Sequence, residues 1–277
     1  MKSLSSAFEG KKALVTYIAA GDPDLETTAY LLKLLDTEGV DVLEVGIPFS
    51  DPLADGPVIQ QASQRALAGG ATLKKILGML KDLRNEISAP RVLMGYMNSV
   101  LAYGQEKFAA DAAGAGVSGV IIPDLPFHQG ERLAALLREQ GVDFILMVTP
   151  NTPAERLRGI CERASGFLYC VSRLGVTGES GTAEASPKEY MDRVRSHTSL
   201  PLALGFGVSA PEKAALAAKA ADGVVVGSAL ISLLEPCGTD RELLRSKAVP
   251  FLGSLRKALD SAGQKAARCE PGRKTGV

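Results

Sequence analysis

Short apolar runs alternate with amphipathic segments along almost the whole chain, and this alternation constrains the fold more than any other feature. The runs are five to seven residues long, the length of buried strands in a parallel sheet. Strands are predicted at 13–19, 42–46, 91–97, 119–123, 143–148, 167–172, 202–206 and 223–227. A helical segment follows each one, which is the pattern of a single-domain α/β protein with a (β/α)8 TIM barrel. The alternative, a doubly wound Rossmann-like sheet, would require a GxGxxG motif after the first strand, and the chain has none there.

The helical segments predict the extent of this domain. Helices are expected at 3–10, 25–38, 58–68, 72–86, 104–115, 129–140, 153–164, 187–198, 210–221, 228–234 and 240–262. Thr152 and Pro153 are expected to be the N-cap and first residue of the helix that ends near 164. The barrel domain is therefore predicted to span 1–262. Residues 263–277 are polar and basic and are expected to form a mobile tail.

Composition excludes several classes of function. With 31 Lys and Arg against 31 Asp and Glu, the formal net charge is zero, which argues against a nucleic-acid-binding protein. The four cysteines show no CxxC spacing, so reduced thiols and no metal site are expected. Residues 13–20 look like a short signal-peptide core but lead into Gly-Asp-Pro and an amphipathic helix, so we interpret them as the first strand. No apolar stretch is long enough to span a membrane, and a cytoplasmic location is expected.

One strand and the loop after it carry three carboxylates. Glu44 lies in the apolar strand 42–46, where burial would raise the pKa of its carboxyl group toward the range of a general acid/base. Prolines at 48, 52 and 57 stiffen the loop that holds Asp51 and Asp55. A salt bridge for Glu44 and a helix N-cap role for Asp55 remain alternatives.

Two glycine turns indicate an anion site. Gly205-Phe206-Gly207 ends the seventh strand, and Gly227-Ser228 ends the eighth where a short extra helix begins. In barrels of this kind, the loops after these two strands often bind phosphate through backbone N–H groups. Tight turns without a ligand are the alternative. The loop 173–186 after the sixth strand contains several glycines and is longer than usual, so it could be a lid over the site or only a surface loop.

The run LEVGIPFSDPLADGP, Leu43 to Pro57, is similar to the signature of the tryptophan synthase α subunit family. The similarity continues in order over roughly residues 7 to 260. It is carried by Gly21-Asp22-Pro23, Tyr96 and Asn98, Pro123-Asp124-Leu125-Pro126, Ser172-Arg173, Thr177-Gly178, Gly205-Phe206-Gly207 and Gly227-Ser228. The resemblance implies a TIM-barrel lyase that cleaves indole-3-glycerol phosphate to indole and glyceraldehyde 3-phosphate in L-tryptophan biosynthesis.

The resemblance also implies roles for individual residues. Glu44 would be the general acid/base, Asp55 would polarise the indole N–H, and Tyr169 would support them. The indole pocket would be lined by Tyr17, Met94, Tyr96, Ile121 and Phe206. The substrate phosphate would be held by Gly178, Gly207, Gly227 and Ser228, under a lid that contains Arg173 and Thr177.

The family pattern implies a partner as well. A β subunit carrying pyridoxal phosphate would receive the indole within an αββα heterotetramer, and this chain would need no cofactor of its own. Phe49, Asp51, Pro52 and Asp124 lie on loops after the second and fourth strands and are the expected interface. A lyase that works alone and a barrel retained only to activate a partner are the alternatives.

Two features depart from the family pattern, and the two histidines have no role in it. Ala19 stands where many members of the family have Thr, and the tail beyond Gly263 is longer than expected. His128 and His197 are chemically suited to acid/base work, but they fall in a loop and near a helix end, so we do not expect either to be catalytic.

Overall fold

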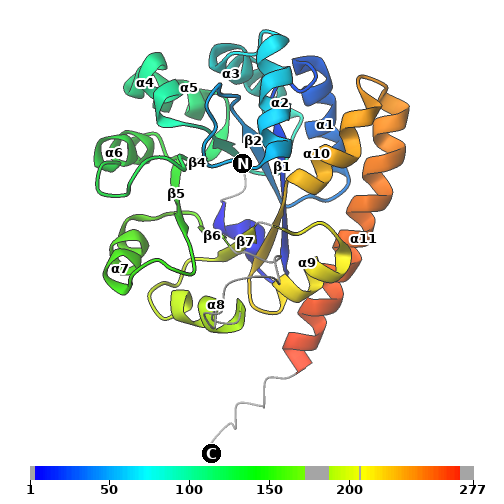
Figure 1. The fold of residues 1–277 in the computed structure, drawn as a ribbon. Helices are drawn as coiled ribbons and strands as arrows, with labels where there is room; N and C mark the ends of the chain where they lie inside the picture. The colour runs from blue at the N-terminus through cyan, green and yellow to red at the C-terminus, as the bar shows by residue number, and fades with distance from the viewer. Residues whose placement is uncertain (1–3, 172–186, 206, 269–277) are drawn as a thin grey trace, which may run out of the picture.

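The chain folds into a closed barrel of eight parallel strands surrounded by helices (Figure 1). This computed structural model describes residues 4–171, 187–205 and 207–268, and side chains as far as 263. The strands are β1 (Ala13–Ala19), β2 (Val42–Gly46), β3 (Arg91–Met94), β4 (Val117–Ile121), β5 (Asp143–Val148), β6 (Leu168–Val171), β7 (Leu202–Gly205) and β8 (Gly223–Val226). Each strand pairs with the next, and β8 pairs with β1, so the predicted TIM barrel is confirmed.

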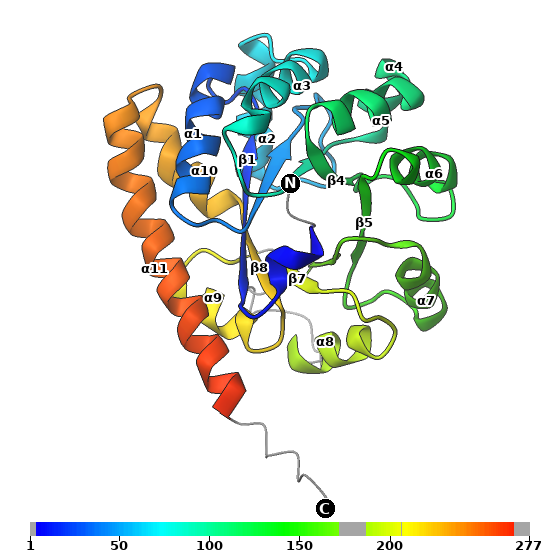
Figure 2. The same cartoon turned by 180° about the vertical axis from the view of Figure 1, so that it is seen from behind.

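Alternating residues of the strands fill the inside of the barrel. The interior cluster includes Val15, Val42, Val92 and Ile145, while their neighbours in sequence pack outward against the helices. A short 3-10 helix, η1 (Ser5–Phe8), lies across the N-terminal end of the barrel, as Figure 2 shows from behind. The ring of Phe8 lies 5.2 Å from that of Phe167. The barrel is therefore a packed core covered at its N-terminal end, and a site is expected at the C-terminal end, where such barrels carry it.

The helices agree with the predicted segments in order but not always in extent. They are α1 (Leu25–Thr37), α2 (Pro57–Ala68), α3 (Leu73–Asp82), η2 (Leu83–Asn85), α4 (Met97–Tyr103), α5 (Gln105–Gly114), α6 (Glu131–Glu139), α7 (Ala154–Arg163), α8 (Pro187–Arg195), α9 (Pro211–Ala218), α10 (Ser228–Leu234), η3 (Glu235–Cys237) and α11 (Arg241–Arg268). Within the described ranges, no helix is both long and apolar enough to cross a membrane.

Three details of the predicted helices were wrong. Helix α4 was missed, and β3 is shorter than expected because α4 begins only three residues after Met94. The predicted cap of α7 is also incorrect: Pro153 is the N-cap, and the Thr152 hydroxyl accepts from the backbone N–H of Thr149 instead. Helix α11 continues to Arg268, six residues beyond its predicted end, and the remaining tail 269–277 lies outside the described residues.

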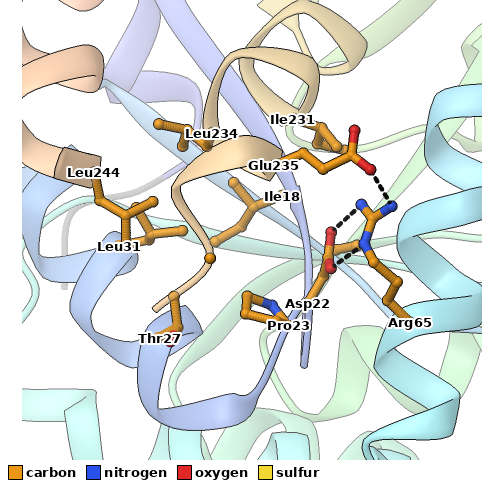
Figure 3. Close-up of a pocket in the computed structure, with 12 residues that line it drawn as sticks. Ile18, Asp22, Pro23, Thr27, Leu31, Arg65, Ile231, Leu234, Glu235 and Leu244 are labelled. Atoms are coloured by element: carbon orange, nitrogen blue, oxygen red, sulfur yellow. Dashed lines mark hydrogen bonds and ion pairs between the residues drawn. The ribbon is translucent and has the colours of Figure 1, made fainter. Parts of the chain in front are cut away.

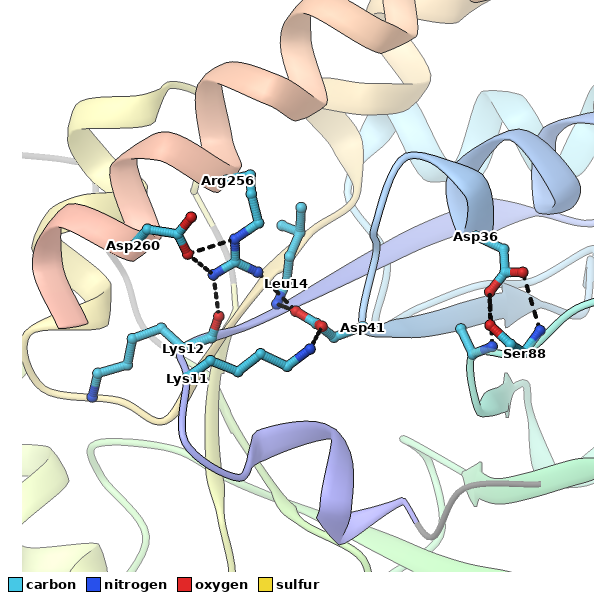
Figure 4. Close-up of polar contacts among 9 residues, drawn as sticks. Lys11, Lys12, Leu14, Asp36, Asp41, Ser88, Arg256 and Asp260 are labelled. Atoms are coloured by element: carbon cyan, nitrogen blue, oxygen red, sulfur yellow. Dashed lines mark hydrogen bonds and ion pairs between the residues drawn. The ribbon is translucent and has the colours of Figure 1, made fainter. Parts of the chain in front are cut away.

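A buried carboxylate ties β2 to β1 and α11 at the N-terminal end of the barrel (Figure 4). The side chain of Asp41, which directly precedes β2, is only 5% exposed. Its Oδ2 accepts hydrogen bonds of 2.8 Å from the Leu14 backbone N–H and from Arg256 Nη1, and its Oδ1 accepts from Lys11 Nζ. Arg256 also donates to the backbone carbonyl of Lys12. This network belongs to the end of the barrel that usually serves stability, not catalysis.

Candidate functional site

Glu44 lies in the middle of β2 with its side chain inside the barrel. It is 1% exposed, and neither carboxylate oxygen has a hydrogen-bond partner among the described residues. Tyr17 of β1 and Val92 of β3 are its register partners. The salt bridge considered as an alternative for Glu44 is therefore absent from the part of the chain that the structure describes. An unpaired buried carboxyl is costly for folding, and such groups occur where chemistry requires them.

Burial and a neighbouring carboxylate both raise the pKa of Glu44, to about 8. Desolvation is the larger cause because it disfavours the charged form, and the negative charge of Asp55 adds to it. Near neutral pH this carboxyl group can therefore both give and take a proton. That property is what a general acid/base requires.

Asp55 is held in place by its contacts on the loop between β2 and α2. Tyr96 donates from its hydroxyl to Asp55 Oδ2 at 3.0 Å, and the same hydroxyl accepts from the Ala54 backbone N–H at 2.9 Å. Burial raises the pKa of Asp55, while the Tyr96 hydrogen bond lowers it. The N-cap of α2 is Gly56, with no side-chain hydrogen bond to the cap, so the helix-cap role for Asp55 is wrong. Its carboxylate is therefore held by Tyr96 and not by the N-terminus of α2.

Two tyrosines lie near Glu44 in the barrel interior, and a glycine makes room for each. A Cβ on Gly46 would lie 2.1 Å from the Tyr17 hydroxyl, and one on Gly205 would lie 2.6 Å from the Tyr169 hydroxyl. Burial raises the pKa of both phenols well above the usual value, and the charge of Glu44 contributes to each shift. The predicted residue Tyr169 therefore does share the interior with Glu44. The need for Gly46 and Gly205 was missed, because contact across a barrel leaves no local pattern in the sequence.

Of the predicted indole-pocket residues, Tyr17, Met94 and Ile121 belong to two apolar clusters of the barrel interior. Tyr17 and Met94 belong to one small cluster, and Met94 also packs against the core cluster that contains Ile121 and Tyr169. Phe206 lies outside the described residues. The other members of the small cluster were not predicted; they are Ala19, Val58, Ile59, Ala62 and Ile231. The apolar residues at the start of α2, directly after Asp55-Gly56-Pro57, were the available signal.

The two glycine turns both lie at the C-terminal end of the barrel. Gly207 follows β7 with a φ of +77°, a conformation that favours glycine, and is exposed. Gly227 is the N-cap of α10, and Ser228 is the first residue of that helix and is exposed. Gly178, Arg173 and Thr177 fall within 172–186, outside the described residues.

The predicted partner residues lie on two loops at the same end of the barrel. Phe49 is half-buried and stacks on Tyr96 with ring centroids 5.1 Å apart, so it contacts the residue that positions Asp55. Asp51 is exposed, Pro52 is half-buried, and the neighbouring Leu53 is 93% exposed. Asp124 accepts a hydrogen bond from the backbone N–H at the start of α4.

The two histidines make contacts elsewhere. His197 Nδ1 lies 3.0 Å from the Arg193 carbonyl just after α8, and the ring of His128 packs edge-on against Phe127. Neither is among the groups that shift the pKa of Glu44. No group of three or more His, Cys, Asp or Glu in the described ranges could hold a metal ion.

Comparison with known proteins shows which family this chain is similar to. The family model described as tryptophan synthase alpha chain matches residues 4–259. The tryptophan synthase alpha chain of Petrotoga mobilis is 50% identical over 256 residues, which cover 92% of this chain and 99% of the relative. That of Geobacter sulfurreducens is 47% identical over 249 residues, covering 90% and 94%.

Solved structures agree with this result. A crystal structure of the tryptophan synthase alpha chain from Legionella pneumophila superposes with a TM-score of 0.84 at 37% identity, covering 94% of this chain and 98% of that one. A chain of tryptophan synthase from M. tuberculosis in an aminoacrylate-bound form superposes with a TM-score of 0.81 at 34% identity, covering 93% of this chain and 100% of that one. With a barrel that buries Glu44 with no hydrogen-bond partner among the described residues, this chain belongs to the tryptophan synthase alpha chain family, whose members are lyases of tryptophan biosynthesis that cleave indole-3-glycerol phosphate.

Proposed function

We propose that the reaction is a retro-aldol cleavage in which Glu44 moves both protons. The carboxylic acid gives a proton to C3 of the indole ring, and the carboxylate then takes the proton of the side-chain hydroxyl as the bond from C3 to the glycerol phosphate chain breaks. Indole and glyceraldehyde 3-phosphate leave, and Glu44 returns to its starting form. The observation that carries this proposal is the burial of Glu44 with no hydrogen-bond partner in the described part of the chain, which goes with a pKa of about 8.

Asp55 would polarise the indole N–H. Protonation at C3 makes the ring cationic, and a fixed carboxylate beside the ring nitrogen stabilises that charge in a site shielded from water. The hydrogen bond from Tyr96 and the anchoring of the Asp55 carbonyl by Gln60 Nε2 at 2.8 Å both limit its movement. Tyr169 would support Glu44 from across the barrel, and Tyr17, Met94, Ile121 and Phe206 would contact the indole ring.

The test of the proposed function is release of indole from indole-3-glycerol phosphate, with and without added β subunit. Indole release that the β subunit accelerates supports a lyase that works in a complex. Equal rates in both arms would favour a lyase that works alone, and no release in either arm would leave only an activating role for the barrel.

The substrate phosphate would be bound by backbone N–H groups at Gly207, Gly227 and Ser228, together with Gly178. Gly207→Asp is expected to raise KM at least tenfold, because a negative charge would face the phosphate. Gly207→Asn is the matched control, since Asn has the same shape and tolerates positive φ equally well. Steady-state kinetics of both variants check this, and an equal KM in the two would place the phosphate elsewhere.

The partner would be a β subunit that carries pyridoxal phosphate, in a cytoplasmic αββα heterotetramer that passes indole between the subunits. The loop containing Phe49, Asp51 and Pro52 and the loop containing Asp124 would form the interface. The exposed Leu53 adds an apolar group to this surface, and the prolines keep the loop ordered before docking. Because Phe49 stacks on Tyr96, movement of the loop would be transmitted to Asp55. Docking would also favour closure of the lid with Arg173 and Thr177.

Pro52→Gly is expected to reduce activation by the β subunit several-fold while basal activity stays nearly unchanged. A more flexible loop loses more entropy on docking, whereas Asp55 keeps its bond to Tyr96. Indole release measured against β subunit concentration checks this. Pro201→Gly is the control, because Pro201 precedes β7 at the opposite end of the barrel. If Pro52→Gly lowered basal and stimulated rates by the same factor, with unchanged β affinity in calorimetry, this loop would not be the interface.

A further inference from the structure

Three segments of the barrel mouth meet at the guanidinium group of Arg65 on α2 (Figure 3). Arg65 Nε and Nη2 donate to the two carboxylate oxygens of Asp22, each at 2.8 Å. Nη1 donates to Glu235 Oε1, also at 2.8 Å. Asp22 lies in the loop after β1, and Glu235 directly follows α10. One side chain in the last turn of α2 therefore connects this helix to the β1–α1 loop and to the start of η3.

Each connected segment carries part of the proposed site. Helix α2 begins two residues after Asp55, strand β1 carries Tyr17, and α10 begins with Ser228. Helix α10 also packs against both α2 and β1. Since it has seven residues, its start and Glu235 are only about 10 Å apart, so a shift at one end of this short rod displaces the other.

On the side where α10 faces the β1–α1 loop, packing alone does not fix the two segments relative to each other. A pocket of about 260 Å³ lies among the end of β1, α1, α10 and the start of α11, with Ile18, Leu31, Leu234 and Leu244 in its walls. Arg65, Asp22 and Glu235 line the same pocket (Figure 3). Because the described side chains leave this space open, dispersion contacts that would fix α10 against the β1–α1 loop are missing there. Arg65 connects the two directly, through its hydrogen bonds to Asp22 and Glu235.

The loop itself is closely packed on the side of α2. A Cβ on Gly21 would lie 2.5 Å from the Cβ of Ala71 and 3.4 Å from that of Ala66. The Asp22 side chain is only 12% exposed and that of Arg65 is 32% exposed, so this bidentate pair is partly shielded from water. The geometry of this pair is therefore suited to hold the loop in a fixed position relative to α2.

We propose that Arg65 is a positioning residue of the lyase site, which sets the location of α10 and the β1–α1 loop through Asp22 and Glu235. This inference rests on the proposed function, because α10 matters only if Ser228 helps bind the substrate phosphate. The effect is expected mainly on KM. Arg65 is not among the groups that shift the pKa of Glu44, so the pH dependence of kcat should stay as in the wild type.

The experiment compares four variants in steady-state kinetics with indole-3-glycerol phosphate. Arg65→Met is expected to raise KM about tenfold with kcat changed less than about threefold, because misplacement away from the chemistry weakens binding geometry. Arg65→Lys should restore part of the loss, since an ammonium can pair with Asp22 but cannot form the fork. Glu235→Gln should raise KM less, in the same direction. Arg195→Met is the control, because it breaks an ion pair to Asp222 at the other end of the barrel.

Amide hydrogen exchange of the free protein supplies a second readout that does not depend on activity. Arg65→Met should speed exchange in residues 20–24 and 228–235 and leave β2 unchanged. Unchanged KM, an equal rise in KM for Arg195→Met, or an altered pH profile of kcat would each overturn the proposal, as would unchanged exchange in both segments. If the wild type releases no indole, the proposed function fails, whereas the exchange measurement still decides whether Arg65 holds these segments. Should Arg65→Met not fold, Glu235→Gln with unchanged KM and exchange overturns the proposal.

Discussion

Glu44→Gln is expected to lower indole release by about 10² to 10⁴-fold or more, with KM changed little. The amide has nearly the shape of the carboxyl group, so the barrel and the binding site remain, but it cannot give or take the protons that the cleavage needs. Because both proton transfers would be affected, we expect a larger loss of activity from this substitution than from any other one described above. Single-turnover and steady-state assays of indole release check the effect. Near-wild-type turnover would remove Glu44 from the mechanism.

The same variant is expected to be more stable than the wild type at alkaline pH. The pKa of Glu44 is about 8 in the folded chain and near its ordinary value of 4.5 when unfolded. Below the unfolded value both states are protonated. As the pH rises from 4.5 to about 8, the unfolded state ionises before the folded state does. The free energy of unfolding of the wild type therefore falls, by at most about 5 kcal/mol at pH 9. Gln cannot ionise and avoids this loss.

Urea unfolding at pH 5 and pH 8.5 checks the prediction. Glu44→Gln and the wild type should differ little at the lower pH and clearly at the higher one. Asp55→Asn provides the comparison, because Asp55 is only half-buried and is bonded to Tyr96. A stability gain for Glu44→Gln that does not depend on pH would show that its carboxyl group is not held protonated by burial.

Asp41→Ala is expected to destabilise the protein by about 3 kcal/mol, the second largest effect. The substitution removes the acceptor for the buried Leu14 N–H and one partner of Arg256, whose side chain is 22% exposed. Breaking a buried pair from one side leaves the other charge uncompensated, which costs about 3 to 5 kcal/mol, and the partial exposure of Arg256 and Lys11 places this case at the lower end. Chemical denaturation measures the change directly.

Two further variants make this test specific. Asp260→Ala removes only the exposed i,i+4 partner of Arg256, so it should change the free energy of unfolding by less than about 0.5 kcal/mol (Figure 4). Asp41→Asn retains an acceptor for the Leu14 N–H and should lie between the two. Indole release per folded molecule should stay close to that of the wild type in all three, because Asp41 precedes β2 at the end of the barrel away from Asp55. Equal losses of stability for Asp41→Ala and Asp260→Ala would contradict the network in Figure 4.

Much of the barrel could be predicted because its strands are short, apolar and separated by clear helix signals. Strands β1, β2 and β5 have the predicted bounds, and α1 begins at its predicted residue, where Asp24 caps it by accepting from the Thr27 N–H. Helix α4 was missed because its seven residues follow β3 at once, and Gly104 with a φ of +93° separates it from α5. The cap at Thr152 failed because its hydroxyl found a nearer partner within its own turn.

The site was less open to prediction than the fold. Burial of Glu44 followed from its place in an apolar strand, but whether a salt bridge would neutralise it depended on neighbours from other strands. The same holds for Asp55, because the residue that binds its carboxylate is Tyr96, 41 residues away, and not the N-terminus of the next helix. Similarity to a family identified which residues to consider. It did not show that Phe49 and Asp55 both contact Tyr96.

The sequence by itself determined the order of strands and helices, the placement of Glu44 on a buried strand and the stiffness of the loop with Asp55, since these depend on local periodicity and proline geometry. Only the tertiary structure decided what surrounds them. Barrel closure brings β1, β2 and β6 around one interior, where Glu44 has no hydrogen-bond partner among the residues that the structure describes. It also makes Gly46 and Gly205 necessary beside the tyrosines and joins Asp22, Arg65 and Glu235. Burial and electrostatic coupling depend on distances in space, and residues far apart in sequence carry no local signal of them.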